Sequence, residues 1–243
     1  MRYIMSDVHA EYELFVALLR EIGFSDKDEL YIIGDVIDKG ADSVRLLKYI
    51  LERDNIHLSM GNHEYEFLKL YHSLIDKEDV DFDEVLLKLR EYFPNDGHLL
   101  DYETVDMLEL LPTYFDEPDF IGVHAGLLLD EDGRAISPAE LPIEEIIYNR
   151  SFKSPGVLPA DSRCVFFGHT SSMSVFPDAS IIVYKRGEDE SGNIKDYIKV
   201  HLDTGAFVSG ILGCFSIDEC RCYFVRRGQP GLAPSRLGRI ENL

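Results

Sequence analysis

The stretch LYIIGDVID, residues 30–38, decides the fold of this chain. Its first four residues form an apolar run that predicts a short buried strand, and a glycine and two aspartates follow it. Similar strands are predicted at residues 3–6 and 56–59, while residues 11–23 and 43–53 place apolar side chains at helical spacing. Strand and helix therefore alternate, and this order predicts a parallel sheet with right-handed crossovers.

The remainder of the chain predicts a helical insertion followed by further strands. Residues 65–111 carry acidic and apolar side chains at helical spacing, so we expect a cap of two or three helices and not a separate domain. Further strands are predicted at residues 120–124, 164–167, 180–184, 197–202, 211–217 and 222–225. Residues 187–193 are polar and glycine-rich and predict a turn. Residues 229–243 predict a loose C-terminal tail outside a domain that spans residues 1–228.

The composition limits the class of protein. The 243 residues include 24 Lys and Arg and 45 Asp and Glu, which gives a formal net charge of −21. This charge repels phosphate backbones and anionic membranes, so we expect no nucleic-acid partner and no membrane partner. No apolar run approaches the roughly 20 residues of a membrane span, and the N-terminus lacks a signal-peptide core. We therefore expect a cytoplasmic globular protein.

The four cysteines, Cys164, Cys214, Cys220 and Cys222, are expected to be reduced thiols in that compartment. Cys220 and Cys222 are one residue apart, and in a strand both side chains would point to the same face. Such a pair can serve redox chemistry or bind a metal, but packing as small hydrophobic residues is the interpretation that we prefer.

Polar side chains follow five of the predicted strands, at the point where each strand ends. The segments are Asp7-Val8-His9, Gly34-Asp35-Val36-Ile37-Asp38, Gly61-Asn62-His63-Glu64, Val123-His124-Ala125-Gly126 and Gly168-His169-Thr170. The ligand crevice of an open α/β sheet lies beyond the carboxyl ends of its strands, so these segments should converge. Carboxylate, imidazole and amide groups bind divalent metals, and this many ligands favours two ions that share a bridging carboxylate.

In this combination the five segments resemble the motifs of the calcineurin-like metallophosphoesterases, in particular the phosphoprotein phosphatase branch. That branch includes bacterial and phage Ser/Thr protein phosphatases and symmetrical diadenosine tetraphosphate hydrolases. The resemblance covers about residues 1–210 and includes Asp203-Thr204-Gly205-Ala206. It implies an α/β fold, a four-layer sandwich of mixed β-sheets flanked by helices, as a single domain with a helical cap insertion.

The resemblance also implies a role for each motif residue. The metal ligands would be Asp7 and His9 for a first ion, Asp35 for both ions, and Asn62, His124 and His169 for the second. Manganese, iron and zinc all accept such ligands. A metal-bridged hydroxide would attack the phosphorus, His63 would protonate the leaving oxygen, and Asp38 would orient the His63 ring. Arg150 would bind the phosphoryl group, with Lys39 beside it.

Two positions depart from the pattern of the branch. Lys39 stands where these proteins usually carry an arginine, and lysine contacts phosphate as a point charge without the bidentate fork. Ala10 stands where a glycine usually follows the histidine, which predicts a loop without positive φ or a slightly displaced approach. Outside the motifs, His201 lies two residues before Asp203 and is a candidate for supporting the site from behind.

We therefore expect a two-metal phosphoesterase that hydrolyses phosphomonoesters, and a Ser/Thr-type protein phosphatase is the interpretation that we favour. The first alternative is a symmetrical dinucleoside polyphosphate hydrolase, because the sequence shows no motif that separates the two substrates. The second is a metal-binding regulatory module with weak turnover, which Lys39 favours and an intact His63 and Asp38 oppose. The partner would be a small phosphoester or a phosphopeptide, and the oligomeric state is not predicted.

Overall fold

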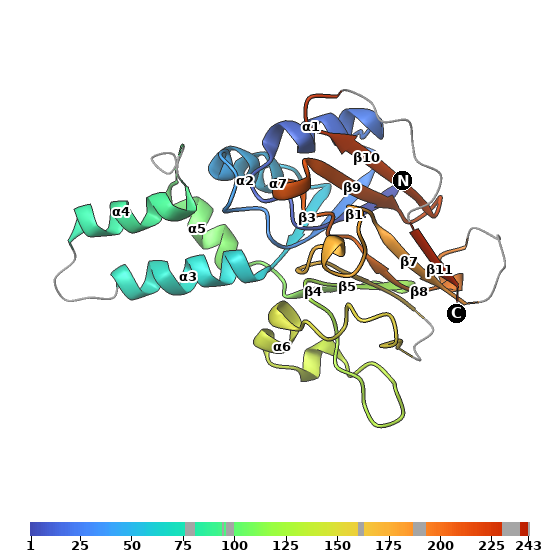
Figure 1. Cartoon of the computed structure of the whole chain (residues 1–243). Helices are drawn as coiled ribbons and strands as arrows, with labels where there is room; N and C mark the ends of the chain where they lie inside the picture. The colour runs from blue at the N-terminus through green and yellow to red at the C-terminus, as the bar shows by residue number, and fades with distance from the viewer. Residues whose placement is uncertain are drawn as a thin grey trace.

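The protein is a sandwich of two mixed β-sheets with helices on its outer faces, as the computed structural model shows (Figure 1). The structure describes residues 1–75, 81–93, 95, 100–159, 163–186, 193–229 and 239–242. The first sheet has the strand order β10 (Arg221–Arg226), β9 (Ile211–Ser216), β1 (Arg2–Met5), β2 (Glu29–Ile33) and β3 (Ile56–Ser59). The second has the order β11 (Arg239–Asn242), β7 (Ile182–Lys185), β8 (Tyr197–His201), β6 (Cys164–Phe167), β5 (Phe120–Val123) and β4 (Tyr114–Asp116).

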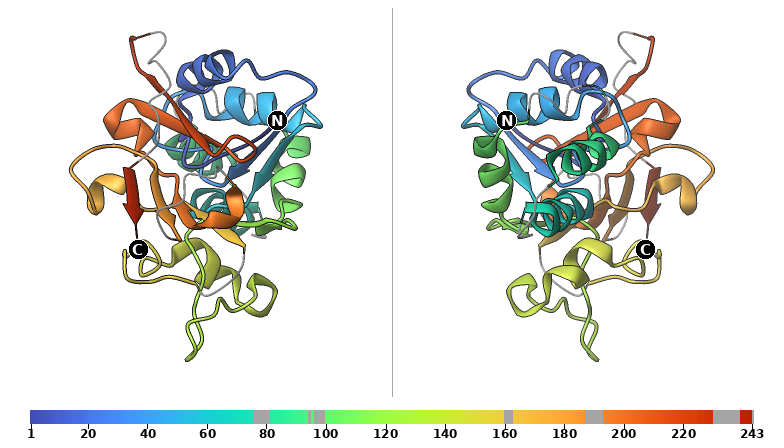
Figure 2. Two further views of the ribbon diagram at one scale, coloured as in Figure 1. Left: turned by 90° about the vertical axis from the view of Figure 1, so that its right-hand side faces the viewer. Right: turned by 90° about the vertical axis from the view of Figure 1, so that its left-hand side faces the viewer.

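The predicted alternation of strand and helix is confirmed in the first third of the chain. β1 pairs in parallel with β2, and β2 with β3, while α1 (Tyr12–Glu21) and α2 (Ser43–Leu51) connect them. The buried face of α1 consists of the apolar residues whose spacing predicts it, Leu14, Phe15, Leu18 and Leu19. Figure 2 shows α1 and α2 on one side of the molecule and α6 (Ile143–Tyr148) on the opposite side.

The main core lies between the two sheets. Because side chains alternate along a strand, Tyr31 and Ile33 of β2 face the second sheet, where they pack with Phe120 and Phe166. Their neighbours Leu30 and Ile32 face the other way, toward α1 and α2. On the far side, α6 packs on the outer face of the second sheet. Helix, sheet, sheet and helix therefore form four layers, which confirms the predicted fold class.

Helices α3 (Asn62–Ile75), α4 (Phe82–Tyr92) and α5 (Tyr102–Glu109) form an arm that projects from the sandwich (Figure 1). The arm occupies the range in which the sequence predicts helices, except that α3 begins at Asn62. The first turn of the arm is therefore the motif Asn62-His63-Glu64, so the arm starts inside the predicted site. The ring of Phe67 packs edge-on against Phe93, with their centroids 5.0 Å apart, and holds α3 to the end of α4.

Several short elements were not predicted. They are β4, α6, α7 (Ala206–Ser209) and the 3₁₀ turns η2 (Pro138–Glu140), η3 (Ser172–Ser174) and η4 (Ile194–Asp196). The prediction of a loose tail is wrong for residues 239–242, which form β11 and pair in parallel with the edge strand β7. An unpaired sheet edge accepts such a short segment although its sequence shows no apolar alternation. A domain boundary at residue 228 stays a prediction.

The turn predicted at residues 187–193 lies outside the described residues, apart from Asn193. Within the described part of the chain, no helix has the length and apolar character that a membrane span requires. All four cysteines are free and buried. Cys222 lies in β10, but Cys220 precedes this strand in a turn with φ of 51°, so the two thiols do not share a strand face as expected. Burial raises the pKa of Cys220 to about 11, which supports packing over redox chemistry.

Candidate metal centre

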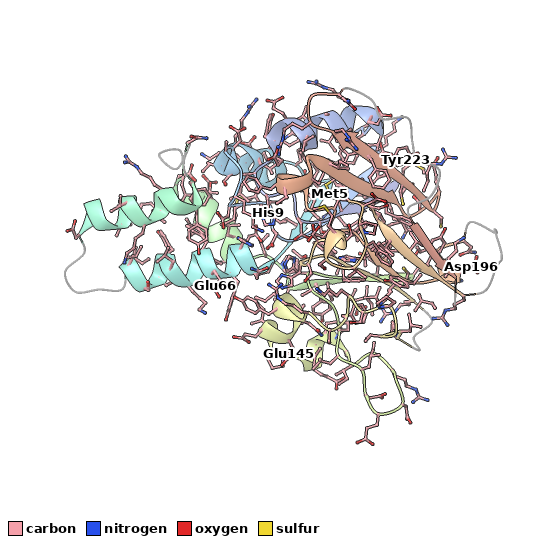
Figure 3. The ribbon with its side chains drawn as sticks, viewed as in Figure 1. Met5, His9, Glu66, Glu145, Asp196 and Tyr223 are labelled. Atoms are coloured by element: carbon pink, nitrogen blue, oxygen red, sulfur yellow. The ribbon has the colours of Figure 1, made fainter. Side chains whose placement is uncertain are left out.

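Strands of both sheets end at one place, where the arm joins the sandwich. The loops after β1, β2 and β3 carry Asp7, Asp35 and Asn62, and the second sheet adds His124 after β5 and His169 after β6. Figure 3 labels His9 in this region, at the root of the arm. The five predicted segments therefore meet although they are up to 162 residues apart, as the hydrogen bond between His169 and Asp7 shows.

Asp35 is the centre of this cluster. Its carboxylate oxygens lie 3.7 Å from Nε2 of His9, 3.7 Å from Nε2 of His63 and 3.4 Å from Nε2 of His124. The cluster contains two groups of potential ligand atoms, and within each group the atoms lie no more than 4.8 Å apart. One group is His9, Asp35 and His63, and the other is Asp35, His124 and His169. Because both groups include Asp35, this carboxylate has the position of a bridging ligand.

Backbone carbonyl groups orient two of the histidines. Nδ1 of His124 donates to the carbonyl oxygen of Ile33 at 2.8 Å, which directs Nε2 into the cluster. Nδ1 of His9 lies 3.3 Å from the carbonyl oxygen of Ile37, and its Nε2 accepts a hydrogen bond from the Lys39 ammonium at 2.8 Å. A backbone carbonyl that fixes the ring in this way is typical of metal-binding histidines.

Asn62 and Asp7 contact the other histidines of the cluster. Oδ1 of Asn62 lies 3.0 Å from Nε2 of His124 and 2.8 Å from Nδ1 of His169. The backbone N–H of His169 donates to Oδ2 of Asp7 at 3.0 Å. Among the described residues, the buried atoms Oδ1 of Asp7 and Nε2 of His169 have no hydrogen-bond partner. Such atoms are rare in folded proteins, and both types bind metals, so the cluster fits two divalent cations.

Burial and the pair of Asp35 and His124 set the charges of the cluster. Burial disfavours both charged forms, but their attraction raises the pKa of His124 to about 10 and holds the pKa of Asp35 well below its usual range. Burial, with the positive charges of His124 and Arg150, lowers the pKa of His169 to about 4. Burial also lowers the pKa of His9. His9 and His169 are therefore neutral, the form that binds metals, whereas His124 would release its proton on binding a cation.

The loops of the site have an unusual backbone. Non-glycine residues with φ between 47° and 68° gather here: Asp7, His9, Ala10, Asp35, Asp38, Lys39 and His169. The expectation that Ala10 avoids positive φ is wrong, since its φ is 57°. Its N–H donates to the carbonyl oxygen of Val36 at 2.7 Å, and the N–H of His9 donates to the backbone carbonyl oxygen of Asp35 at 2.9 Å. These bonds between the first two loops offset a strain of about 1–2 kcal/mol per residue.

Glu64, to which the sequence assigned no role, holds the loops after β2 and β3 together. Its side chain is fully buried and accepts hydrogen bonds from the backbone N–H groups of Asp35, Val36 and Ile37 at 2.8, 2.8 and 3.2 Å. A fourth bond comes from the N–H of Gly61 at 3.0 Å. Gly61 permits this packing, because a Cβ there would lie 2.3 Å from Oδ1 of Asp35. The sequence signal that could have indicated this role is a glutamate in the first turn of a helix, directly after the motif residues Asn62 and His63.

His63 and Asp38 form a pair at the edge of the cluster. Nδ1 of His63 donates to Oδ2 of Asp38 at 2.8 Å, so Nε2 faces Asp35. Burial opposes protonation of the ring, but the bond to Asp38 and the charge of Asp35 outweigh burial and raise the pKa of His63. A ring that keeps its proton to higher pH is suited to donate it to a leaving group.

Arg150 and Tyr148 bring the α6 side of the molecule to the cluster. Arg150 is exposed, and its positive charge makes a small contribution to the lowered pKa of His169, after burial and the charge of His124. The ring of Tyr148, which was not predicted, lies edge-on to His169 with the centroids 6.4 Å apart. Its hydroxyl donates to Glu66 of α3, so this contact joins α6 to the arm. Figure 3 labels Glu66 on α3 and Glu145 on α6.

The end of β8 supports the cluster from behind. Nε2 of His201 lies 2.6 Å from the carbonyl oxygen of Thr170, and the His201 ring stacks on Phe167 at 4.6 Å. His201 therefore holds the residue after His169, which is the supporting position expected for it. Asp203 is also buried here, and burial together with the charges of the neighbouring cluster carboxylates raises its pKa well above the usual range.

The chain is similar in sequence to known phosphoesterases. A profile described as calcineurin-like phosphoesterase matches residues 3–173. The symmetrical bis(5'-nucleosyl)-tetraphosphatase of Buchnera aphidicola subsp. Acyrthosiphon pisum is 37% identical over 87 residues, 35% of this chain and 32% of that protein. The protein of the same name from Chromobacterium violaceum is 30% identical over 130 residues, 52% of this chain and 43% of that protein. These matches span less than half of each relative's length.

Solved structures match over nearly the whole chain. A candidate diadenosine tetraphosphatase superposes with a TM-score of 0.65 and 19% identity, over 95% of this chain and 94% of that protein. A metallophosphoesterase from Sphaerobacter thermophilus gives a TM-score of 0.56 and 21% identity, over 93% and 86%. At these identities the superpositions show the fold alone. The profile match, which covers more than half of the residues, shows that the chain belongs to the calcineurin-like phosphoesterase family.

Proposed function

We propose that this protein is a two-metal hydrolase of phosphoesters. The observation that carries the proposal is that two groups of ligand atoms share the carboxylate of Asp35. The first ion would be held by His9, Asp35 and Asp7, whose Oδ1 lies 3.9 Å from Nε2 of His9, while His63 of the first group serves as the proton donor. The second ion would be held by Asp35, Asn62, His124 and His169. When bound, two divalent cations make water a stronger nucleophile and neutralise the phosphoryl oxygens. Manganese, iron and zinc all suit these oxygen and nitrogen ligands.

The residues of the chain supply the proton and bind the phosphoryl group in this proposal. His63 donates a proton from Nε2 to the leaving oxygen, while Asp38 holds the ring through Nδ1. Arg150 binds the phosphoryl oxygens with its planar fork. Lys39, whose ammonium lies 2.8 Å from Nε2 of His9, adds a second positive charge beside the cluster.

A dinucleoside polyphosphate is the substrate that we propose, in place of the phosphoprotein favoured from the sequence. Relatives named as symmetrical bis(5'-nucleosyl)-tetraphosphatases support this choice. A cavity of about 360 Å³ that includes Lys39 continues to Arg227 and to Phe207, whose side chain is 40% exposed. Two cations and an accessible aromatic ring fit a chain of phosphates that ends in a base. Glu11, which lies 2.6 Å from Arg227, reduces the positive charge of this cavity only in part.

A substrate panel tests both levels of the proposal. Purified protein with Mn²⁺ should hydrolyse diadenosine tetraphosphate with a kcat/KM at least about tenfold above that for a phosphoserine peptide, and a chelator should stop both reactions. Faster turnover of the phosphopeptide would identify a protein phosphatase instead. A protein that is fully loaded with metal but inert toward both substrates and p-nitrophenyl phosphate would be a metal-binding regulatory module.

A further inference from the structure

Lys199 of β8 is a fully buried lysine whose ammonium group is completely hydrogen-bonded. Nζ donates to the backbone carbonyl oxygens of Phe152 at 2.6 Å, Ser154 at 2.9 Å and Val157 at 2.6 Å. It also lies over the ring of Tyr184, 4.6 Å from the centroid. An ammonium group has three N–H donors, and all three are used here. Burial lowers the pKa of Lys199 to about 7, and the three carbonyl partners offset the cost of burying the polar group.

The three carbonyl groups belong to the segment that carries Arg150. Residues 149–159 form neither helix nor strand, and the segment has two backbone turns of its own, Ser154 N–H to the Ser151 carbonyl and Val157 N–H to the Ser154 carbonyl, both at 3.0 Å. The remaining backbone groups need partners from elsewhere. At the start of the segment, Oδ1 of Asn149 accepts from the N–H of Ser151 at 2.9 Å, and its Nδ2 donates to the carbonyl oxygen of Leu127 at 3.2 Å. Lys199 fixes the other end. Arg150 is therefore held between these two anchors.

The same segment packs on the loops of the metal centre. Gly126, two residues after His124, lies so close to Phe152 that a Cβ there would be 2.3 Å from the Cβ of Phe152. The ring of Phe152 also packs edge-on against Phe167 of β6, with the centroids 5.0 Å apart. Phe152 thus packs the Arg150 segment against the ends of β5 and β6. Lys199 holds Phe152 in place through its carbonyl group.

We propose that Lys199 is a positioning residue for the substrate phosphate: through the carbonyl groups of residues 152, 154 and 157 it holds Arg150 where its guanidinium binds the phosphoryl oxygens. The inference rests on the proposed function, because that function assigns the phosphoryl group to Arg150. A lysine with a purely structural role would affect only folding. A positioning lysine also sets the affinity for phosphate, and its effect requires Arg150.

Lys185 of the adjacent strand β7 provides a matched control. Its side chain is also buried, with 6% exposed, and its ammonium lies over the ring of Tyr197 at 4.7 Å. β7 pairs with β8 so that Tyr184 lies opposite Lys199, and the register shifts between Tyr184 and Lys185. The ring under the Lys185 ammonium, Tyr197, belongs to the core between the two sheets, away from the Arg150 segment. Lys185→Met therefore removes a buried ammonium from the same sheet without removing an anchor of the Arg150 segment.

The test measures phosphate affinity in single and double variants. Lys199→Met should weaken the binding of inorganic phosphate, measured by calorimetry with Mn²⁺ present, by about tenfold, and should raise KM for p-nitrophenyl phosphate more than it lowers kcat. Lys185→Met should leave both values unchanged at a comparable loss of Tm. In an Arg150→Ala background, Lys199→Met should add almost nothing, because it acts through the missing residue. Lys199→Gln, which keeps two donors, replaces Lys199→Met if that variant does not fold.

Unchanged phosphate binding in a folded Lys199 variant would overturn the inference, and so would a full additional loss in the Arg150→Ala background. The failure of the proposed function gives a different result: metal-loaded wild-type protein then hydrolyses none of the substrates. Because the calorimetric measurement does not need turnover, it tests Lys199 in either case.

Discussion

Carboxylates gather at both ends of the sandwich, but their partners differ. At the carboxyl ends of β1, β2 and β5, carboxylates and imidazoles gather, and Oδ1 of Asp7 is buried without a hydrogen-bond partner among the described residues. At the amino end of β1, Arg2 donates to both oxygens of Asp119 at 2.9 Å and to Asp218 at 2.8 Å. Asp119 precedes β5, so this network joins the two sheets. Paired charges thus stabilise the fold at one end, while at the other end two buried atoms, Oδ1 of Asp7 and Nε2 of His169, have no partner among the described residues and could bind metals.

Replacement of His63 tests the site end and has the largest expected effect. His63→Asn should lower kcat by about 10²–10⁴, because the leaving oxygen loses its proton donor. Metal content and Tm should stay at the wild-type values, since the ring is at the edge of the cluster. Turnover, metal analysis and thermal unfolding measure the three quantities. Undiminished turnover would remove His63 from the mechanism.

Replacement of Glu64 shows whether the strained loops depend on one carboxylate. In Glu64→Gln an amide NH₂ replaces an oxygen that accepts backbone N–H groups, so donor would face donor. We expect a lower Tm and an affinity for Mn²⁺ reduced by about 10- to 100-fold, measured by titration calorimetry. Glu103→Gln, at an exposed position of α5, is the control and should change neither value. Equal metal affinity in both variants would refute the role of Glu64.

Much of the first sheet could be predicted from sequence, because its signals are local. The strand 56–59 matches β3 at both ends, and the two aspartates of the second loop, Asp35 and Asp38, are only three positions apart in the sequence. The contacts that complete the site are not local. Lys199 binds carbonyl groups more than 40 residues away, and no residue type marks a carbonyl as its partner. The positive φ of Ala10 is likewise set by a bond to Val36 in another loop.

Lys39→Arg tests the smaller difference between this chain and the branch that it resembles. A guanidinium fork at this position should contact phosphate at two points, which should lower KM for p-nitrophenyl phosphate by about two- to fivefold. Metal affinity measured by calorimetry should change less than KM. An unchanged or higher KM would mean that the Lys39 side chain does not face the substrate.

Arg2→Met tests the opposite end of the sandwich. Loss of the network should lower stability by about 1–2 kcal/mol, a few degrees in Tm, because partly buried charged hydrogen bonds are lost. The kcat should be retained, since the change is at the far end of β1. The exposed pair of Lys69 and Glu66, 3.4 Å apart, offers the control Lys69→Met, which should change Tm very little. A loss of activity in folded Arg2→Met would show that the two ends are coupled.

The same network predicts a small dependence of stability on pH. The hydrogen bonds from Arg2 lower the pKa of Asp119, so the folded state binds this proton less readily than the unfolded state. The stabilisation is therefore complete above the unfolded pKa of about 3.9 and is lost as the pH falls through the folded pKa. The difference in Tm between wild type and Arg2→Met should stay constant from pH 7 to 5 and narrow below about pH 4. A constant difference down to pH 3 would contradict this assignment.

The most direct test of the two-metal centre is a titration of metal-free protein with Mn²⁺, in which bound metal and phosphoesterase activity are followed together. The shared position of Asp35 predicts that about two equivalents bind and that turnover develops only as the second site fills. Full activity after one equivalent, or saturation of both sites without any hydrolysis of p-nitrophenyl phosphate or diadenosine tetraphosphate, would contradict the account.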